Sequence, residues 1–299
     1  MSYHIVHILS HGSYISVDRG FLVMKTKEYE RRAPISEILC VVVCARGVSF
    51  SSNSLSELIQ NGAVILHCDE RYKPIGKTVG LPRIVHSQIF QRQIERQGEF
   101  ADELWEKIIY GKVENQAYVL DIIGVGKNPL WKYLEENKVE EGACAKVYWR
   151  LYFSSFDKAG PNAREKRLAE HPINAMLNYA YAVMGAIVHR SIIAHGLCPL
   201  LGIHHKFKFK SDPLVYDLME PMRPFCDLML YLSFTEDENF SMDTFIKGFA
   251  KRLVEMRIKM PKKTKVLDAI DRYINMVAEC FYRGNTKPLK IPLIRDLDL

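Results

Sequence analysis

The spacing of apolar residues changes once along this chain, and that change constrains the fold more than any other feature of the sequence. Through residue 84, β-branched and aromatic residues form short runs between turn residues, which is typical of strands: "HIVHILS", "YISVDRGFLVMK", "EILCVVVCA" and "AVILHCDE". From Val85 to about residue 283 the apolar residues recur at helical spacing. The sequence therefore predicts an α+β protein with a small, sandwich-like β domain (1–84), a larger all-α domain (85–285) and an extended tail (286–299).

The β-rich part also contains one short helical pattern, "SLSELIQNG". Ser54 and Glu57 have the spacing of a capping box at its start, and the Asn-Gly pair at 61–62 predicts its end. The later stretch "YKPIGKTVGLP" is rich in turn residues, so we expect it to lead out of the β domain. The domain boundary is predicted at the Leu-Pro pair at 81–82.

Composition argues against several classes of protein. Of the 299 residues, 48% are hydrophobic, which is enough for a sizeable core and argues against wholesale disorder. The longest apolar tract, from Ala175 to Val188, includes Asn178 and is too short for a membrane span, so it predicts a buried helix. The start "MSYHIVHILSHG" lacks the pattern of a secretory signal, and seven cysteines without a CxxC pair fit a reducing compartment. We therefore expect a cytoplasmic protein that does not associate with membranes.

The formal net charge of +6 is concentrated in one segment. Residues 251–265, "KRLVEMRIKMPKKTK", contain seven basic residues and one acidic residue, so the rest of the chain is balanced. A localised basic segment indicates a polyanionic partner, although a solvated helix face would give the same pattern.

Imidazole and carboxylate side chains gather in the apolar second half of the chain. His204 and His205 end the loop "GLCPLLGIHH", and Asp217 and Glu220 follow at a spacing that places them on one helix face. Glu141 precedes four small residues, "GACA", at the start of another helical pattern. One imidazole with two or three carboxylates suits Mg²⁺ or Mn²⁺. On spacing alone, a solvated glutamate, a hydrogen-bonded histidine pair and an acid at a helix start remain open alternatives to a metal site.

Several segments carry a resemblance to a known family. They are "EGACAKVYW", "HPINAMLNYAYAVM", "GLCPLLGIHH", "SDPLVYDLMEPMRP" and the trailing Asp227. In this order they resemble the spacer-acquisition integrases of CRISPR adaptation, the larger subunit of the adaptation complex, over nearly the whole chain. The stretch "FKFKSDPLVYDLMEPMRP" is most similar to the type II branch. Trp149 departs from the family pattern, in which phenylalanine is usual at that place.

The resemblance implies a role for each candidate residue. Glu141, His205 and Glu220 would bind Mg²⁺ or Mn²⁺ and carry catalysis, with Asp217 as a candidate accessory ligand and His204 as a neighbour. The family's fold implies an N-terminal β domain that forms a homodimer and a C-terminal helical domain that carries the catalytic site. A small ferredoxin-like partner protein is also implied, whose dimer lies between two such homodimers.

The activity implied by the resemblance is the joining of 3′-hydroxyl ends of short spacer DNA to the repeat borders of a CRISPR array by transesterification. Two other interpretations of the same residues remain open. A general metal-dependent DNA nuclease would use the same ligands with water as the nucleophile. A non-catalytic DNA-binding scaffold would use the carboxylates structurally, although three convergent ligands have no evident use in a scaffold.

Double-stranded DNA would be held by basic residues outside the metal site. In "KFKFK", an extended backbone places three lysines on one side and Phe207 and Phe209 on the other, where bases of an opened duplex end can stack. A hairpin that buries both rings is the alternative, and Arg223 is close enough to Glu220 to contact either a phosphate or a carboxylate. The candidates for phosphate contact are Arg164, Lys166, Arg167, Lys206, Lys208, Lys210, Arg223, Lys262, Lys263 and Lys265.

Overall fold

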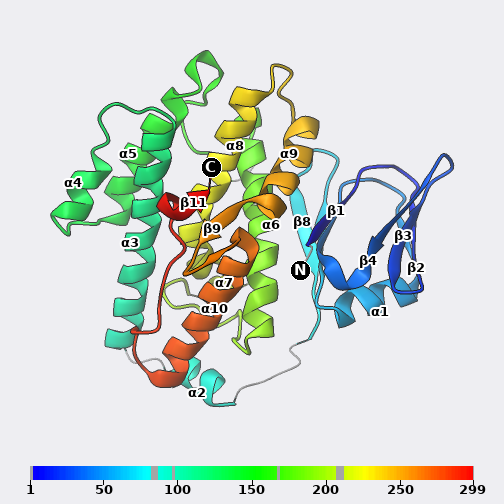
Figure 1. Ribbon diagram of the computed structural model, residues 1–299, viewed down its shortest axis with the longest axis horizontal. Coiled ribbons are helices and arrows are strands. Elements are labelled where there is room, and N and C mark those ends of the chain that lie inside the picture. Colours follow the sequence, from blue (N-terminus) through cyan, green and yellow to red (C-terminus); the bar gives the residue numbers. More distant parts are fainter. Residues whose placement is uncertain (1–2, 82–86, 96–97, 167–168, 207–211, 299) are drawn as a thin grey trace.

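The computed structural model describes residues 3–81, 87–95, 98–166, 169–206 and 212–298. Strands fill the first of these ranges and helices dominate the others, which confirms the α+β class (Figure 1). The last strand of the N-terminal part ends at Thr78 and the next helix begins at Ser87, so the predicted boundary falls at the edge of the described range. Within the described ranges, no helix is long and apolar enough to cross a membrane.

Two four-stranded sheets form the N-terminal part. The first has the order β1-β5-β7-β8, with parallel pairing except for the antiparallel edge strand β8. The second has the order β4-β3-β2-β6. The strand bounds of the first sheet are His4–Ile8, Ile38–Val43, Val64–Cys68 and Pro74–Thr78, and those of the second are Glu30–Pro34, Phe21–Lys25, Tyr14–Asp18 and Ser49–Phe50.

Strand β5 lies between two hydrophobic cores, which explains why every one of its residues is buried. Successive side chains of a strand point to opposite faces. Ile38 and Val41 pack into a small core with the second sheet, whereas Leu39 and Val42 pack into the large core of the helical part. Helix α6 (Pro172–Ala194) covers the latter face, so the first sheet joins the two parts of the molecule (Figure 1).

Two local predictions in this part are wrong. Helix α1 (Ser52–Gln60) begins two residues before Ser54, and its N-cap is Ser51, whose side chain accepts from the backbone of Ser54. Ser54 is buried and donates to the carbonyl of Ile15, so it fastens the helix to β2. The turn-rich "YKPIGKTVGLP" contains β8, because pairing with β7 stabilises a strand that its proline, glycine and lysines disfavour.

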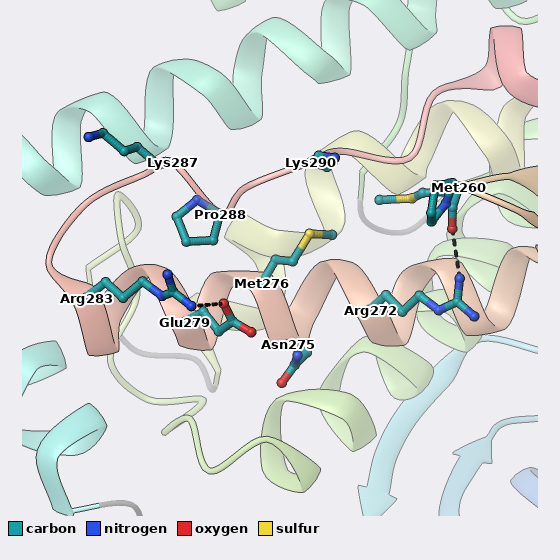
Figure 2. Close-up of a pocket in the computed structure, with 10 residues that line it drawn as sticks. Met260, Arg272, Asn275, Met276, Glu279, Arg283, Lys287, Pro288 and Lys290 are labelled. Atoms are coloured by element: carbon teal, nitrogen blue, oxygen red, sulfur yellow. Dashed lines mark hydrogen bonds and ion pairs between the residues drawn. The ribbon is translucent and has the colours of Figure 1, made fainter.

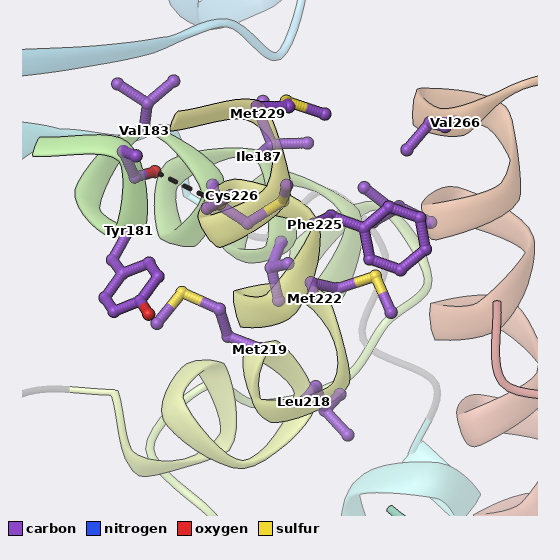
Figure 3. Packing of buried hydrophobic residues seen from close by; sticks show 14 of the residues in the cluster. Tyr181, Val183, Ile187, Leu218, Met219, Met222, Phe225, Cys226, Met229 and Val266 are labelled. Atoms are coloured by element: carbon purple, nitrogen blue, oxygen red, sulfur yellow. Dashed lines mark hydrogen bonds between the residues drawn. The ribbon is translucent and has the colours of Figure 1, made fainter. Parts of the chain in front are cut away.

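The helical part contains nine α-helices within the described ranges, α2 to α10. Helix α6 crosses its centre and is buried along most of its length, which confirms the buried helix predicted over 175–188. Met219, Met222, Phe225 and Cys226 pack beside Tyr181 and Ile187 of α6 (Figure 3). The remaining bounds are Ser87–Glu95, Gly98–Ile122, Leu130–Glu135, Glu141–Ser154, Pro213–Met219, Arg223–Glu236, Met242–Glu255 and Val266–Arg283 for α2–α5 and α7–α10.

The helical part also contains a small three-stranded sheet that the sequence did not predict. The basic segment 251–265 leaves α9 at Glu255 and forms a hairpin of β9 (Arg257–Lys259) and β10 (Lys263–Lys265), so it is not one helix face. The C-terminal tail adds β11 (Leu297–Asp298) to β9. Before that strand, Asn115 of α3 holds the tail by hydrogen bonds to the carbonyl of Pro292 and the amide of Ile294.

Candidate metal site

Glu141 is the first residue of α5, and its acidic neighbour Glu140 has a different role at the start of this helix. Glu140 is the N-cap, and its carboxylate accepts hydrogen bonds from the amides of Gly142 at 3.1 Å and Ala143 at 2.7 Å. These two hydrogen bonds therefore engage both carboxylate oxygens of Glu140. Glu141 keeps 42% of its side chain exposed, and the helix dipole favours its negative charge at this position.

The loop that ends in His205 is wrapped around one buried carboxylate. Asp217 of α7 accepts hydrogen bonds from the amides of Ile203, His204 and His205 at 2.5, 3.1 and 3.1 Å, and it pairs with Nδ1 of the His205 ring at 2.6 Å. Its side chain has no exposed surface, and both of its oxygens are taken by these donors. Asp217 thus positions the loop and the His205 ring, and its role as an accessory metal ligand stays a prediction.

This tight loop requires glycine at residue 202. A Cβ atom on Gly202 would lie 2.4 Å from the carbonyl oxygen of His205 and 2.9 Å from Oδ2 of Asp217. The first atom is backbone and the second belongs to a buried carboxylate held by four hydrogen bonds, so the backbone can approach Asp217 only when residue 202 has no side chain. The "LGIHH" sequence therefore encodes the loop geometry as well as the imidazole.

His205 has one ring nitrogen, Nε2, left for another partner. Its hydrogen bond to the buried Asp217 favours the tautomer in which Nδ1 carries the proton. The same hydrogen bond raises the pKa of His205, against the lowering effect of partial burial, and the charges of Asp217, Glu220 and Glu141 raise it further. The two glutamates therefore lie near enough to act on the ring through their charge.

His204 has a different partner from His205. Its ring stacks on Trp105 of α3, with the centroids 4.3 Å apart and the planes 3° from parallel. The ring of His205 meets the same indole edge-on, at 5.9 Å. His204 therefore fixes the loop against α3, while His205 faces the acidic residues.

Glu220 follows α7 at the start of a short 3-10 turn (Glu220–Met222) and is almost fully buried. Its Oε1 accepts from Nε of Arg223 at 2.9 Å, and its Oε2 accepts from Nζ of Lys112 at 2.7 Å. Burial alone would raise the pKa of Glu220, but the charges and hydrogen bonds of Arg223 and Lys112 lower it to about 2. The carboxylate is therefore ionised at neutral pH.

Lys112 links the two glutamates that the sequence places far apart. Its Nζ lies 2.7 Å from Oε1 of Glu141 and 2.7 Å from Oε2 of Glu220, with only 9% of the side chain exposed. Sequence reasoning missed this residue because a lysine on a helix is usually solvated. One signal was present: Lys112 follows Ile108 at i+4 on the stripe of α3 that faces the core.

The predicted ligands thus share one neighbourhood without converging on a point. Glu141 and Glu220 both pair with Lys112, and their charges raise the pKa of His205. As the side chains stand in the described part of the chain, no three His, Cys, Asp or Glu residues come close enough together to hold a metal ion. The ammonium group of Lys112 holds the position between the two glutamates.

Asp227 anchors the apolar wall behind the site. It accepts hydrogen bonds from the hydroxyls of Tyr148 at 2.7 Å and Tyr181 at 2.5 Å, and its burial raises its pKa to about 6. The guanidinium group of Arg223 lies over the ring of Tyr181 at 4.8 Å. Arg223 is therefore committed to Glu220 and this ring, which favours the carboxylate partner over a phosphate.

The other basic candidates differ in their surroundings. Arg164 lies over the rings of Trp149 and Tyr181 and is hydrogen-bonded to Asn178, so it is part of the wall. Lys166 and Lys206 are exposed. Lys263 pairs with Asp298 at 2.5 Å, Lys265 lies over the ring of Tyr3, and Lys262 is exposed. The candidates outside the described residues, with the two phenylalanines of "KFKFK", are Arg167, Phe207, Lys208, Phe209 and Lys210.

A separate groove of about 510 Å³ lies along the outer side of α10. Its wall includes Met276 and Pro288, and Arg272, Arg283, Lys287 and Lys290 surround it (Figure 2). Arg283 pairs with Glu279, and Arg272 donates to the carbonyl of Met260. None of the predicted metal ligands lines this groove, so it is distinct from the site described above.

Comparisons with known proteins place the chain among similar sequences and folds. A family model described as CRISPR associated protein Cas1 matches residues 6–272. The CRISPR-associated endonuclease Cas1 of Neisseria meningitidis serogroup C (strain 8013) is 26% identical over 302 residues, which cover 97% of this chain and 96% of that protein.

Two solved structures have a similar fold. A casposase bound to integration product gives a TM-score of 0.76 at 19% identity, covering 97% of this chain and 94% of its own. A chain of a Cas6-RT-Cas1–Cas2 complex gives a TM-score of 0.73 at 12% identity, covering 97% of this chain and 36% of its own.

Proposed function

The chain belongs to the CRISPR-associated protein Cas1 family, and from this premise we propose that it is a metal-dependent DNA integrase of CRISPR adaptation. Its reaction joins the 3′-hydroxyl ends of short spacer DNA to the repeat borders of a CRISPR array by transesterification. The protein acts in the cytoplasm. Its membership of the type II branch remains a prediction from the "FKFKSDPLVYDLMEPMRP" stretch.

One observation carries the proposal: the pairing of His205 with the buried Asp217. A histidine that binds a metal usually donates its other ring N–H to a carboxylate, which fixes the ring and its tautomer. Nδ1 of His205 has that partner, so Nε2 is the free ligand atom. Together with the carboxylates of Glu141 and Glu220, it makes a donor set that suits Mg²⁺ or Mn²⁺.

Glu141, His205 and Glu220 would hold the ion. When bound, the ion would stabilise charge on the scissile phosphate and lower the pKa of the attacking hydroxyl. Glu220 contributes a carboxylate that stays ionised, because two cations lower its pKa to about 2. Buried apolar residues around Asp227 exclude water on the side of Glu220, which strengthens the interactions of its charge, whereas Glu141 stays partly exposed.

The DNA itself supplies the nucleophile in this mechanism. Cys144 follows Glu141 on α5 and Cys226 lies on α8 after Glu220, and burial raises the pKa of each thiol, so neither is poised as a thiolate. Tyr148 and Tyr181 are fully engaged with Asp227, and burial raises their pKa well above the usual range. A 3′-hydroxyl brought by the substrate is therefore the nucleophile that best fits these surroundings.

Partners follow from the same proposal. The protein would bind double-stranded DNA, both as spacer precursor and as repeat, form a homodimer through the N-terminal β domain, and assemble with the small ferredoxin-like adaptation protein. The similar casposase structure contains an integration product, which supports the DNA partner, and the similar complex contains Cas2, which supports a partner protein of the adaptation complex.

A strand-transfer assay tests the function. Purified protein and its small partner are incubated with a labelled short duplex and a plasmid that contains a repeat. With Mg²⁺ or Mn²⁺, label should become covalently joined to the plasmid, and a chelator should abolish the product. Nicked plasmid without joined label would favour the nuclease alternative, and DNA binding with no change to either DNA would favour the scaffold.

The basic hairpin should contribute to duplex binding. We expect Lys262→Gln, Lys263→Gln and Lys265→Gln together to reduce the slope of log affinity against log salt by up to about 3, since each phosphate contact contributes about 0.9. Because Lys263 already pairs with Asp298, we expect the slope to change by less than this limit. Titrations of one duplex at several salt concentrations measure it.

A matched variant carries Lys127→Gln, Lys132→Gln and Lys138→Gln near α4, and it removes the same charge from other exposed positions. Its slope should stay at the wild-type value. Equal slopes for the wild-type protein and the hairpin variant would mean that the hairpin lysines are solvated and do not contact phosphates.

A further inference from the structure

Lys112 occupies the electrostatic centre of the metal site. Its ammonium group has three N–H donors, and two of them are directed at ligand oxygens, one on Glu141 and one on Glu220, both at 2.7 Å. The side chains of Lys112 and Glu220 are both almost fully buried, so the bond between them is shielded from water and from screening by salt, whereas the bond to Glu141 is partly exposed. If Glu141 or Glu220 binds a metal ion, its contact with Lys112 must therefore change.

The backbone that carries Lys112 is held firmly. Helix α3 is 25 residues long, and it is fixed next to the site by Asn115, which donates to the carbonyls of Pro221 and Pro292. Trp105, seven residues before Lys112 on the same face, stacks on His204. The helix therefore positions the ammonium group, and only the side chain of Lys112 is free to move.

We infer that Lys112 competes with the divalent cation for the carboxylates of Glu141 and Glu220, and that it thereby lowers the metal affinity of the site. The inference rests on the proposed function, because it concerns the same ligands. A cation bound by both glutamates would stand within a few ångströms of the ammonium group, and like charges at that distance repel strongly in a buried site. Metal entry must therefore turn Lys112 away from the two oxygens.

The same contacts give Lys112 a second effect. Two carboxylates that face one another repel, and the ammonium group between them holds them at a common distance. Lys112 is thus a positioning residue: it keeps the ligands together before the ion arrives, and it yields its place to the ion. The two effects have opposite signs: keeping the ligands together favours metal binding, whereas competition weakens it, and the inference requires competition to be the larger effect.

Calorimetric titration of the full-length protein with Mn²⁺ distinguishes these two roles. Lys112→Met keeps the length and apolar stem of the side chain without its charge. We expect this variant to bind Mn²⁺ at least about tenfold more tightly than the wild-type protein, because the competing cation is gone. Lys107→Met is the control, since Lys107 lies on the same helix and pairs with Glu103 at 2.9 Å outside the site; its affinity should be unchanged. Equal or weaker Mn²⁺ binding by Lys112→Met would overturn the inference.

A second measurement uses the wild-type protein, in case Lys112→Met does not fold. In ¹H–¹⁵N spectra of the lysine ammonium groups, with Lys112 assigned by Lys112→Arg, addition of Mg²⁺ should shift the Lys112 signal and leave that of Lys107 in place. A Lys112 signal that stays unchanged while Mg²⁺ binds would refute the displacement. If no form of the protein binds Mn²⁺ or Mg²⁺, the metal site of the proposed function fails, and the inference with it.

Discussion

Loss of any one of the three proposed metal ligands should reduce DNA joining by about a thousandfold or more, because a catalytic metal is worth several kcal/mol of transition-state stabilisation. The variants are Glu141→Gln, His205→Ala and Glu220→Gln, each measured in the strand-transfer assay with saturating Mg²⁺. Duplex affinity should change little, since the phosphate contacts lie elsewhere. Full joining activity in one of the three would remove that residue from the site.

The three variants differ in what they do to stability. Glu141 is partly exposed, so its replacement should cost little. Glu220 balances two buried cations, and its loss leaves Arg223 without its carboxylate partner and Lys112 with Glu141 alone, which should cost about 3–5 kcal/mol. Thermal unfolding must therefore accompany the Glu220→Gln assay, and activity is compared only at temperatures where the variant remains folded.

Neighbouring residues provide matched controls for the ligand series. Glu140→Gln makes the same substitution one residue before Glu141. The amide oxygen of glutamine can still accept hydrogen bonds from the backbone amides at the start of α5, so DNA joining should remain. Asp217→Ala should lower metal affinity by about 10- to 100-fold by releasing the His205 ring. His204→Ala removes only a stacking contact with Trp105 and should have the smallest effect.

The sequence predicted the large features of the fold because they depend on periodicity. The change from strand to helical spacing near residue 85 is averaged over many residues, so a few exceptions do not obscure it. Single positions were harder. The stretch "SSNSLSEL" offers several serines as N-caps, and Ser51 caps α1 because the extended backbone ends there, which spacing alone does not reveal. Strand β8 depends on its neighbour β7, and no local signal encodes that pairing.

The candidate site shows the same contrast between features that a short sequence motif encodes and contacts that depend on distant parts of the chain. Spacing alone left several interpretations of His205 and Glu220 open, and the family resemblance carried by "LGIHH" and "DLME" singled them out as candidate ligands. Sequence alone did not show that Asp217 binds the loop backbone, since an aspartate has the same spacing whether it binds a metal or four N–H groups. Lys112 reaches the site from α3, 29 residues before Glu141, and only the packing of α3 against the short turn at Glu220 brings it there.

The central claim is that a DNA 3′-hydroxyl, and not water, attacks the target phosphodiester. Two short duplexes of identical sequence test it, one with free 3′-hydroxyls and one that ends in dideoxynucleotides. Both should bind equally, since their backbone phosphates are the same. The loss of the hydroxyl removes the nucleophile itself, so the blocked duplex should give no joined product.

The decisive measurement is therefore the fraction of repeat-bearing target that is cut or joined in the presence of Mg²⁺ with each duplex. The account predicts that the free duplex becomes covalently joined to the target, with one target strand broken per joining event, and that the target remains intact with the blocked duplex. Equal cleavage of the target with both duplexes would show that water is the nucleophile, and it would contradict the assignment as an integrase.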